Sequence, residues 1–282
     1  MKKKLLLSLV VFAGVLFGQE SVVLSFKFQP NKHYLLRTEI ISESVVDFKA
    51  DSHILKEIKK SGISIPIHSE STISMDQEII TSKPNSDGCL DVEMLIKGYK
   101  TKIAMNGQDM GNLIPDEMKD IKVNAIYHPE NKLEVKEVVG ENVSKIMEKS
   151  IREMMAKTIN KFNFPDTVMM VGDSFHQEVP LEIPIANMGI MKIKVISDYR
   201  LERIEEEKSH FNVVSSIKLD TNAEKFKSEA TGTGEGEFIY DSNLKYIRSY
   251  NMDMRMNLKM NLGKVTIVTE SDTETRVNCE EK

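Results

Sequence analysis

The sequence contains only two cysteines and six isolated histidines, and it carries no recognisable catalytic motif. None of the histidines has the HxH or HExxH spacing that typically holds a catalytic metal ion. Ser174 lacks the flanking glycines of a GxSxG nucleophile elbow. The Gly-rich stretch 231–236 lacks the lysine and the helix of a phosphate-binding loop, and we interpret it as a bend or bulge in a strand. We therefore expect no enzyme activity, no catalytic residue, no metal site and no cofactor.

The two cysteines, Cys89 and Cys279, lie far apart in the sequence and form no CxxC motif. This spacing argues against a thiol-redox enzyme and against a zinc site. In an oxidising compartment an even number of cysteines favours a disulfide. A Cys89–Cys279 disulfide and two separate free thiols both remain open on the sequence alone.

Charge of one sign is not concentrated anywhere in the chain. The formal net charge is −5, from 38 basic and 43 acidic residues. The short lysine groups at 59–60 and 225–227 are too small to form basic patches. A mildly acidic, mixed surface argues against a nucleic-acid partner and against binding to an anionic membrane surface.

An apolar run occupies residues 5–17 and follows the three lysines at 2–4. It is too short to span a bilayer comfortably, and with Gly18 before Gln19 it is typical of a bacterial signal peptide. The absence of a following cysteine argues against a lipoprotein. We expect a periplasmic or secreted protein with no integral membrane span after cleavage; an uncleaved anchor is the alternative.

Most of the remaining sequence alternates between apolar and polar residues. Such a period of two is typical of β-strands, and turn residues such as Asn85–Gly88 separate the strands. The pattern predicts long antiparallel strands, among them Tyr34–Val46, Leu90–Ala104, Ile121–Tyr127 and Tyr246–Leu262.

One segment, residues 142–162, has helical spacing of its apolar residues instead. Asn142 is a suitable N-cap, and Pro165 excludes helical backbone at the residue before it. Pairs of opposite charge four residues apart, such as Glu148 and Arg152, support an exposed polar face. We expect a central amphipathic helix over residues 142–163.

The predicted elements divide the chain into a signal peptide (1–18), an N-terminal β half (19–141), the central helix (142–163) and a C-terminal β half (164–282). The two β halves have similar patterns, which suggests one pseudo-duplicated domain. We expect an α+β, mainly β fold in which a strongly curved, half-barrel-like antiparallel sheet, or two sheets, covers the central helix.

The run 251–262 alternates without exception between Met or Leu and polar residues. All its apolar side chains then lie on one face of a strand. The side chains of Met252, Met254 and Met256 would lie about 7 Å apart along that face, so one strand cannot hold a copper ion with three thioethers. The adaptable methionines form either a filled core or the wall of a ligand cavity.

The central helix carries a second group of methionines that could meet this strand. If packing between them is incomplete, an apolar groove results. The candidate ligand-binding residues are Met147, Ile151, Met154, Met155, Met252, Met254, Met256, Leu258 and Met260.

The junction after the helix resembles a known but uncharacterised family of exported Bacteroidetes proteins and lipoproteins. The resemblance rests on Phe164-Pro165-Asp166, on Val171-Gly172-Asp173-Ser174-Phe175, and on the opening segment 26–34. Phe175 stands where a tryptophan is common, and the lipoprotein cysteine is missing. The resemblance implies no activity and no site residue. A weaker likeness of the expected fold to lipoprotein carriers is fold-level analogy.

Two functional hypotheses follow. In the first, the protein is a non-enzymatic exported protein that binds or carries a lipid or another apolar small molecule in a Met-lined groove. In the second, it is an exported structural or protein-interaction module with a filled core, no small-molecule ligand, and another envelope protein as its partner.

Overall fold

The structure is a computed structural model, and part of the chain is described. The expected signal peptide 1–18, Met147, Met154 and much of the expected helix 142–163 lie outside the described residues. The described residues are 21–111, 120–141, 143–145, 148–149, 151–152, 155, 164–165, 167–185, 189–219 and 227–282.

Most of the described chain forms antiparallel β-strands, which confirms the prediction of a mainly β protein. Two strands, β6 and β13, have the bounds expected from the sequence. The strands are β1 (Ser21–Val23), β2 (His33–Ala50), β3 (Ile67–Thr81), β4 (Leu90–Met105), β5 (Gln108–Asp109), β6 (Ile121–Tyr127), β7 (Leu133–Val139), β8 (Val168–Met170), β9 (Ser174–Ile185), β10 (Gly189–Glu205), β11 (Lys208–Leu219), β12 (Lys227–Asp241), β13 (Tyr246–Leu262) and β14 (Val265–Glu281).

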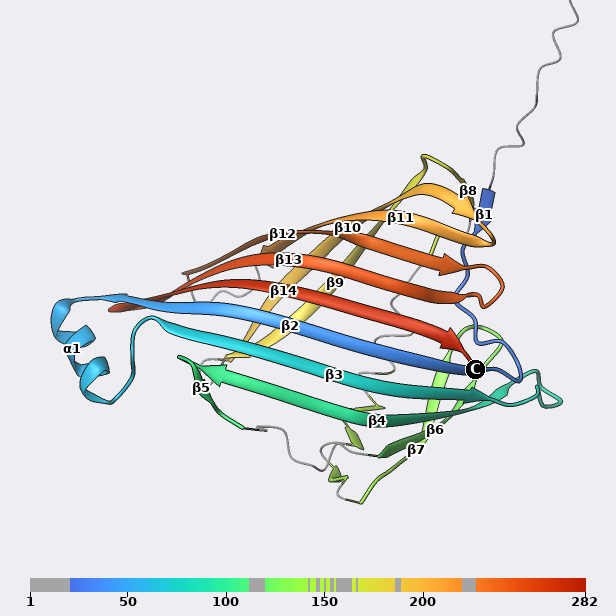
Figure 1. Ribbon diagram of the computed structural model, residues 1–282, viewed down its shortest axis with the longest axis horizontal. Helices are drawn as coiled ribbons and strands as arrows, with labels where there is room; N and C mark the ends of the chain where they lie inside the picture. Colours follow the sequence, from blue (N-terminus) through green and yellow to red (C-terminus); the bar gives the residue numbers. More distant parts are fainter. Residues whose placement is uncertain are drawn as a thin grey trace, which may run out of the picture.

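The large sheet follows one path, β7-β6-β4-β3-β2-β14-β13-β12-β11-β10-β9, and β5 pairs with β4 beside this path. The first and last long strands, β2 and β14, meet in its centre, with Tyr34 opposite Glu281 and Ala50 opposite Val265 (Figure 1). The strands of each half follow one another as antiparallel neighbours on either side of this pair. A separate small sheet pairs β1 with β8.

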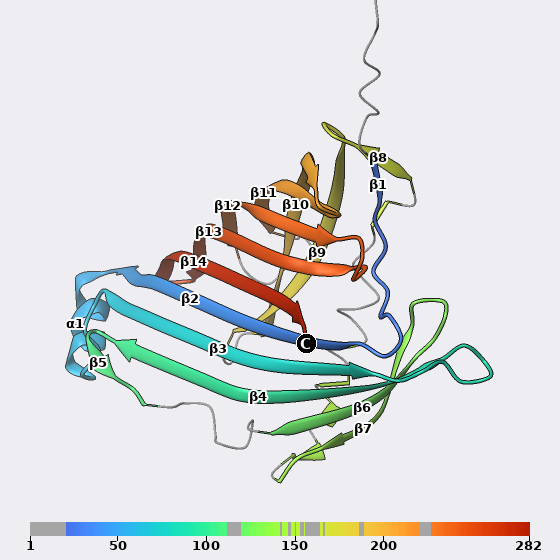
Figure 2. The ribbon, with the colours of Figure 1, turned by 45° about the vertical axis from the view of Figure 1, so that its right-hand side comes forward.

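The large sheet is bent, so that β9 and β10 pass behind β13 and β14 in one view and still lie behind β12 after a 45° turn (Figures 1 and 2). We call its concave side the inner face. It is the side on which Tyr34, Phe238 and Met252 are buried. Register pairing places alternate residues of β2, β12, β13 and β14 on this face.

The stretch 231–236 is regular strand and not the expected bend or bulge. It lies inside β12, and the register shift of that strand lies instead at Ile239/Tyr240. Gly232, Gly234 and Gly236 point to the inner face opposite three methionines of β13. A Cβ on Gly236 would lie 2.1 Å from the carbonyl oxygen of Asn251. At Gly232 and Gly236 the backbone of β13 approaches too closely for any side chain, which explains the glycines at these two positions.

A short helix, α1 (Ser52–Lys60), lies at the tip between β2 and β3 (Figure 1). This helix was not predicted, because its three half-buried apolar residues, Ile54, Leu55 and Ile58, make too short a helical pattern. Within the expected central helix, the described residues 145, 148, 149, 151, 152 and 155 have helical backbone. Among the described residues, no helix is both long enough and apolar enough to cross a membrane.

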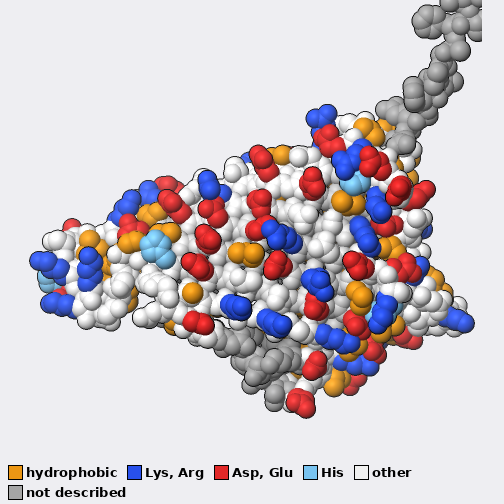
Figure 3. Space-filling view, viewed as in Figure 1, with side chains coloured by type: hydrophobic (Ala, Val, Ile, Leu, Met, Phe, Trp, Pro, Cys, Tyr) orange, Lys and Arg blue, Asp and Glu red, His pale blue; other side chains and the backbone are white. Residues whose placement is uncertain are grey.

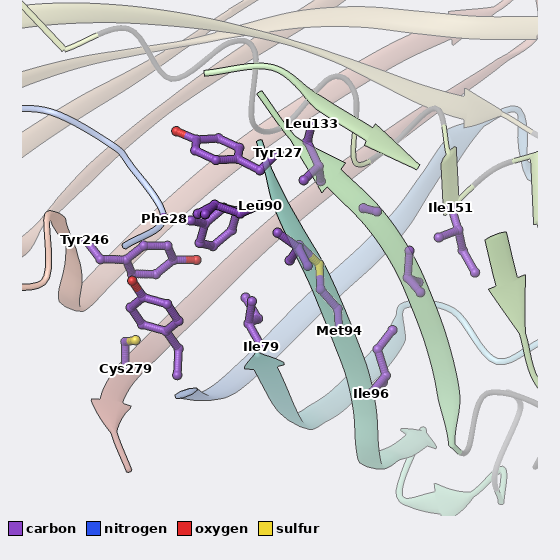
Figure 4. Packing of buried hydrophobic residues seen from close by; sticks show 14 of the residues in the cluster. Phe28, Ile79, Leu90, Met94, Ile96, Tyr127, Leu133, Ile151, Tyr246 and Cys279 are labelled. Atoms are coloured by element: carbon purple, nitrogen blue, oxygen red, sulfur yellow. The ribbon is translucent and has the colours of Figure 1, made fainter. Parts of the chain in front are cut away.

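Three apolar clusters form the core of the described part of the chain. The first lies under β3, β4, β6 and β7 and contains Phe28, Tyr34, Tyr127, Tyr246 and Ile151 (Figure 4). The second contains Phe175, Tyr199, Phe211, Phe238 and Met252. Its aromatic rings contact one another, stacked between Phe175 and Tyr199 and edge-to-face between Phe175 and Phe211. The third, near the opposite end of β13, contains Ile193, Ile217, Ala230, Leu258 and Met260.

Candidate ligand-binding face

The inner face carries no charged side chain and no histidine over the central strands. This holds for every inward position in residues 34–50 of β2, 67–79 of β3, 228–238 of β12, 250–262 of β13 and 265–279 of β14. Their acidic and basic residues all point outward. The inner face is therefore neutral along its whole central part.

The outer face, in contrast, is densely charged with both signs (Figure 3). Its charges form cross-strand ion pairs: the Arg255 guanidinium lies 2.7 Å from the Asp272 carboxylate, and Arg37 lies 3.1 Å from Asp76. These pairs are exposed and screened by solvent, so each contributes little to the stability of the fold. Their effect is to keep one side of the sheet hydrated.

A row of hydroxyl groups crosses the middle of the inner face. Ser71, Ser42 and Thr273 are register neighbours and are half-buried. The Ser42 hydroxyl lies 3.1 Å from that of Thr273, and further along the row the hydroxyls of Ser197 and Ser215 lie 2.7 Å apart. This row continues through Met254 and Gly234. The inner face is thus amphiphilic without being ionic.

The methionine strand, β13, lines this face as its alternation indicates. Met252 is buried in the second cluster, and Leu258 and Met260 are buried in the third. Between them Met254 and Met256 are half-buried and pack against the third cluster. These two thioethers lie opposite Gly234 and Gly232, which have no side chain to compete for the same space. They are therefore adaptable wall residues next to the hydroxyl row.

The candidate residues of the helix lie elsewhere. Ile151 is buried in the first cluster, and Met155 packs against that cluster. Among the described residues, the helix shares the first cluster with Tyr246 at the start of β13, and it shares no apolar cluster with the methionines of that strand. The structure thus brings Met252, Met254, Met256, Leu258 and Met260 together along one strand and places Ile151 and Met155 against another part of the sheet. Their role in ligand binding stays a prediction.

Both cysteines are free thiols, so the disulfide is not formed in this structure. Cys279 is 1% exposed and shares the first cluster with Tyr34 and Tyr246 (Figure 4). Burial raises the pKa of its thiol to about 12. Cys89 is half-buried in the turn between β3 and β4.

Polar side chains also gather in a shallow depression of about 600 Å³ that spans β2, β12, β13 and β14. Glu43, Glu235, Asp253, Asp272 and Glu274 line it together with Arg255. Such a surface suits hydrated ions and water better than an apolar ligand. Within the described part of the chain, no three His, Cys, Asp or Glu side chains are arranged to hold a metal ion.

No known family model matches the chain, and no curated protein matches it. Among solved structures, it is similar to a chain from a study of lipid–protein interactions in lipovitellin, with a TM-score of 0.44 and 12% identity. The similarity covers 90% of this chain but only 26% of the lipovitellin chain. A similarity this low assigns neither a family nor a function, and the resemblance to exported Bacteroidetes proteins stays a prediction.

Proposed function

We propose that this protein is a non-enzymatic exported protein that binds or carries a neutral amphiphile on its inner face. The ligand would have an apolar chain and an uncharged head with hydrogen-bonding groups. The observation that carries the proposal is the complete absence of charge from inward positions of the central strands, combined with the half-buried state of Ser42, Ser71, Thr273, Met254 and Met256.

A neutral head suits this face better than an ionic one. Moving a charged group from water to a site without a counter-charge costs several kcal/mol. Serine and threonine hydroxyls both donate and accept hydrogen bonds, so they can satisfy an ester, amide or hydroxyl head. The row of Ser42, Ser71 and Thr273 offers such groups at neighbouring register positions.

An apolar chain would gain its free energy from leaving water. Each buried CH₂ contributes about 0.8 kcal/mol, so burying even half of a long acyl chain contributes several kcal/mol. Met254 and Met256 are suited to such contacts because an unbranched thioether adapts to chains of different shape. The residues opposite them, Gly234 and Gly232, add no side chain of their own to this part of the face.

The test starts from the protein of residues 19–282, purified under native conditions. Organic extracts of the denatured protein are analysed by mass spectrometry, and the delipidated protein is titrated with a fluorescent monoacylglycerol and with a fluorescent fatty acid. We expect a co-purified neutral lipid, saturable monoacylglycerol binding, and weaker binding of the anionic fatty acid.

Absence of both a co-purified lipid and saturable probe binding would contradict the proposal. That result would favour the structural or protein-interaction module of the second hypothesis. Tighter binding of the fatty acid than of the monoacylglycerol would contradict the argument from charge.

A further inference from the structure

Two turns at one end of the sheet bring Cys89 and His128 together. Leu90 of β4 is the register partner of Tyr127 of β6, so the residues immediately outside this pair are Cys89 and His128. The Cys89 Sγ lies 3.5 Å from the His128 Nδ1. Cys89 and His128 are 39 positions apart in the sequence, and the pairing of β4 with β6 makes them neighbours.

Hydrogen bonds hold both turns. The Asn85 Oδ1 accepts bonds from the backbone N–H of Cys89 at 2.9 Å and of Asp87 at 3.0 Å. In the other turn, the His128 backbone N–H donates to the carbonyl oxygen of Lys132 at 2.8 Å. The thiol and the imidazole are therefore positioned by backbone structure on both sides.

A carboxylate completes the constellation. Glu134 of β7 places its Oε2 3.2 Å from the His128 Nε2, and its Oε1 lies 2.6 Å from the Lys136 Nζ. The hydrogen bonds from Lys136 and then His128 lower the pKa of Glu134. An ionised carboxylate only accepts hydrogen bonds, so the proton of the neutral imidazole lies on Nε2 and Nδ1 accepts from the Cys89 thiol.

A groove of about 430 Å³ lies beside this Cys–His–Glu triad on the outer face, and the three side chains of the triad do not line it. Asp91 and Ile126, two residues inward from Cys89 and His128 on the same face, line the groove, as does Lys136. The side chains of His128 and Glu134 are 27% and 47% exposed, and Cys89 is half-buried. The triad is therefore partly open to solvent, and a small disulfide would approach the sulfur from that side.

The geometry separates the chemistries that a Cys–His–Glu triad could support. A metal ion cannot be shared by the three groups, because the sulfur and the carboxylate lie on opposite ring nitrogens. Acyl transfer needs donors for an oxyanion, and the amide of the nucleophile itself is bonded to Asn85. Attack on a disulfide builds no oxyanion and needs only a nucleophile and a base.

We propose that Cys89 is a reactive thiol that exchanges with low-molecular-weight disulfides, with His128 as its base and Glu134 as a positioning residue. The thiol proton passes to His128 Nδ1, and the sulfur forms a bond to one sulfur of the disulfide as the disulfide bond breaks. The other half leaves as a thiolate and takes the proton from His128. The products are a mixed disulfide on Cys89 and one small thiol, with no further oxidant.

The second cysteine provides an internal control. Cys279 is buried, and burial raises the pKa of its thiol to about 12, so it is inert in the folded protein. Any thiol that reacts rapidly under native conditions is therefore Cys89. No motif marks this site in the amino-acid sequence, because its members come from separate hairpins and form no CxxC motif.

The test is the reaction of the reduced native protein with the neutral reagent 4,4′-dithiodipyridine at pH 7. We expect one equivalent to react rapidly and peptide mass spectrometry to place the adduct on Cys89. The Cys279→Ser variant should keep this rate and Cys89→Ser should lose it. Substitution of His128→Ala should slow the reaction about tenfold or more, because only a few per cent of an unassisted thiol is ionised at pH 7.

A pH profile separates the base from a merely structural role. At pH 10 the reaction no longer depends on a base to take up the thiol proton, so the rates of the wild type and of His128→Ala should converge. Glu134→Gln should fall between them at pH 7, and Glu134→Asp should recover part of the loss. Equal rates for the wild type and His128→Ala at pH 7, or a Cys89 no faster than a cysteine in a short peptide of residues 85–89, would overturn the proposal.

Discussion

At the scale of single residues, the packing of the inner face depends on the glycines of β12 as much as on the methionines of β13 that lie opposite them. The inward glycines of β12 allow β13 to approach so closely that the carbonyl oxygens of Asn251 and Arg255 occupy the space of a Cβ. The methionines of β13 then lie over the bare backbone of β12. The sequence suggested a bend here, because close approach of two backbones leaves no signal beyond the glycines themselves.

This close approach predicts unequal costs for two neighbouring glycines. In Gly236→Ala the new methyl group would lie 2.1 Å from the oxygen of Asn251 and 2.9 Å from the Cα of Met252, so backbone must move. We expect a loss of about 2 kcal/mol or more in the free energy of unfolding. In Gly234→Ala the nearest atoms lie at 3.1 Å and two of the three belong to flexible methionines, so the loss should be smaller. Urea denaturation measures both, and equal costs would contradict this account.

The buried thiol of Cys279 predicts a loss of stability in alkali. Its pKa is raised from 9.0 to about 12 by burial, so above pH 9 the unfolded chain releases a proton that the folded protein retains. Stability is then fully present below pH 9 and falls by about 1.4 kcal/mol per pH unit as the pH rises toward 12. In Cys279→Ala this contribution to the slope disappears. Urea unfolding at pH 8, 9 and 10 measures the free energy of unfolding of the wild type and of Cys279→Ala. The same pH dependence in both proteins would contradict the prediction.

At the scale of elements, the strands were predictable and the pairs between them were not. The period of two identified β6 and β13 to the residue, because one face of each is more buried than the other. The pattern did not reveal that β2 pairs with β14, or that the hairpin turns at Cys89 and His128 meet. Both are long-range pairings, which periodicity along one strand cannot encode.

The edge strand β7 shows how the expected central helix is attached. Arg152 donates to the carbonyl oxygens of Val135 and, at 2.8 Å, of Lys136, and its guanidinium also binds the Glu148 carboxylate at 2.7 Å. Carbonyls of an edge strand would otherwise face water or another chain. The planar fork of an arginine can reach two successive carbonyls and a carboxylate at once.

Replacing the Arg152 guanidinium should therefore destabilise the edge strand β7. We expect Arg152→Lys to lose about 1–2 kcal/mol of stability, because a single ammonium cannot keep all these charge-assisted bonds. Amide hydrogen exchange should become faster in residues 133–139. Lys145→Ala, at an exposed helical residue, is the matched control and should change stability by less than about 0.5 kcal/mol. Equal effects of the two substitutions would contradict the role of Arg152.

At the scale of the whole molecule, two meanders join through β2 and β14 into one continuous sheet with a neutral inner face and a charged outer face. The sequence predicted the class of fold and the apolar strand 251–262. It placed the site between methionines of helix and strand, whereas the structure shows a wider face on which serines and threonines of β2, β3 and β14 take part. These serines and threonines form no motif in the sequence. They become a row of hydroxyl groups only because the strand register places them side by side.

The most direct test adds one carboxylate to either face of the same strand. Ser71 points to the inner face and its neighbour Thr72 to the outer face, and both are half-buried. Each of Ser71→Glu and Thr72→Glu is titrated with the fluorescent monoacylglycerol, after circular dichroism has shown that both proteins are folded. We predict at least about tenfold weaker binding for Ser71→Glu, since an uncompensated charge beside the ligand costs more than about 1.4 kcal/mol, and unchanged binding for Thr72→Glu. Equal affinities in the two folded variants would contradict a ligand on the inner face.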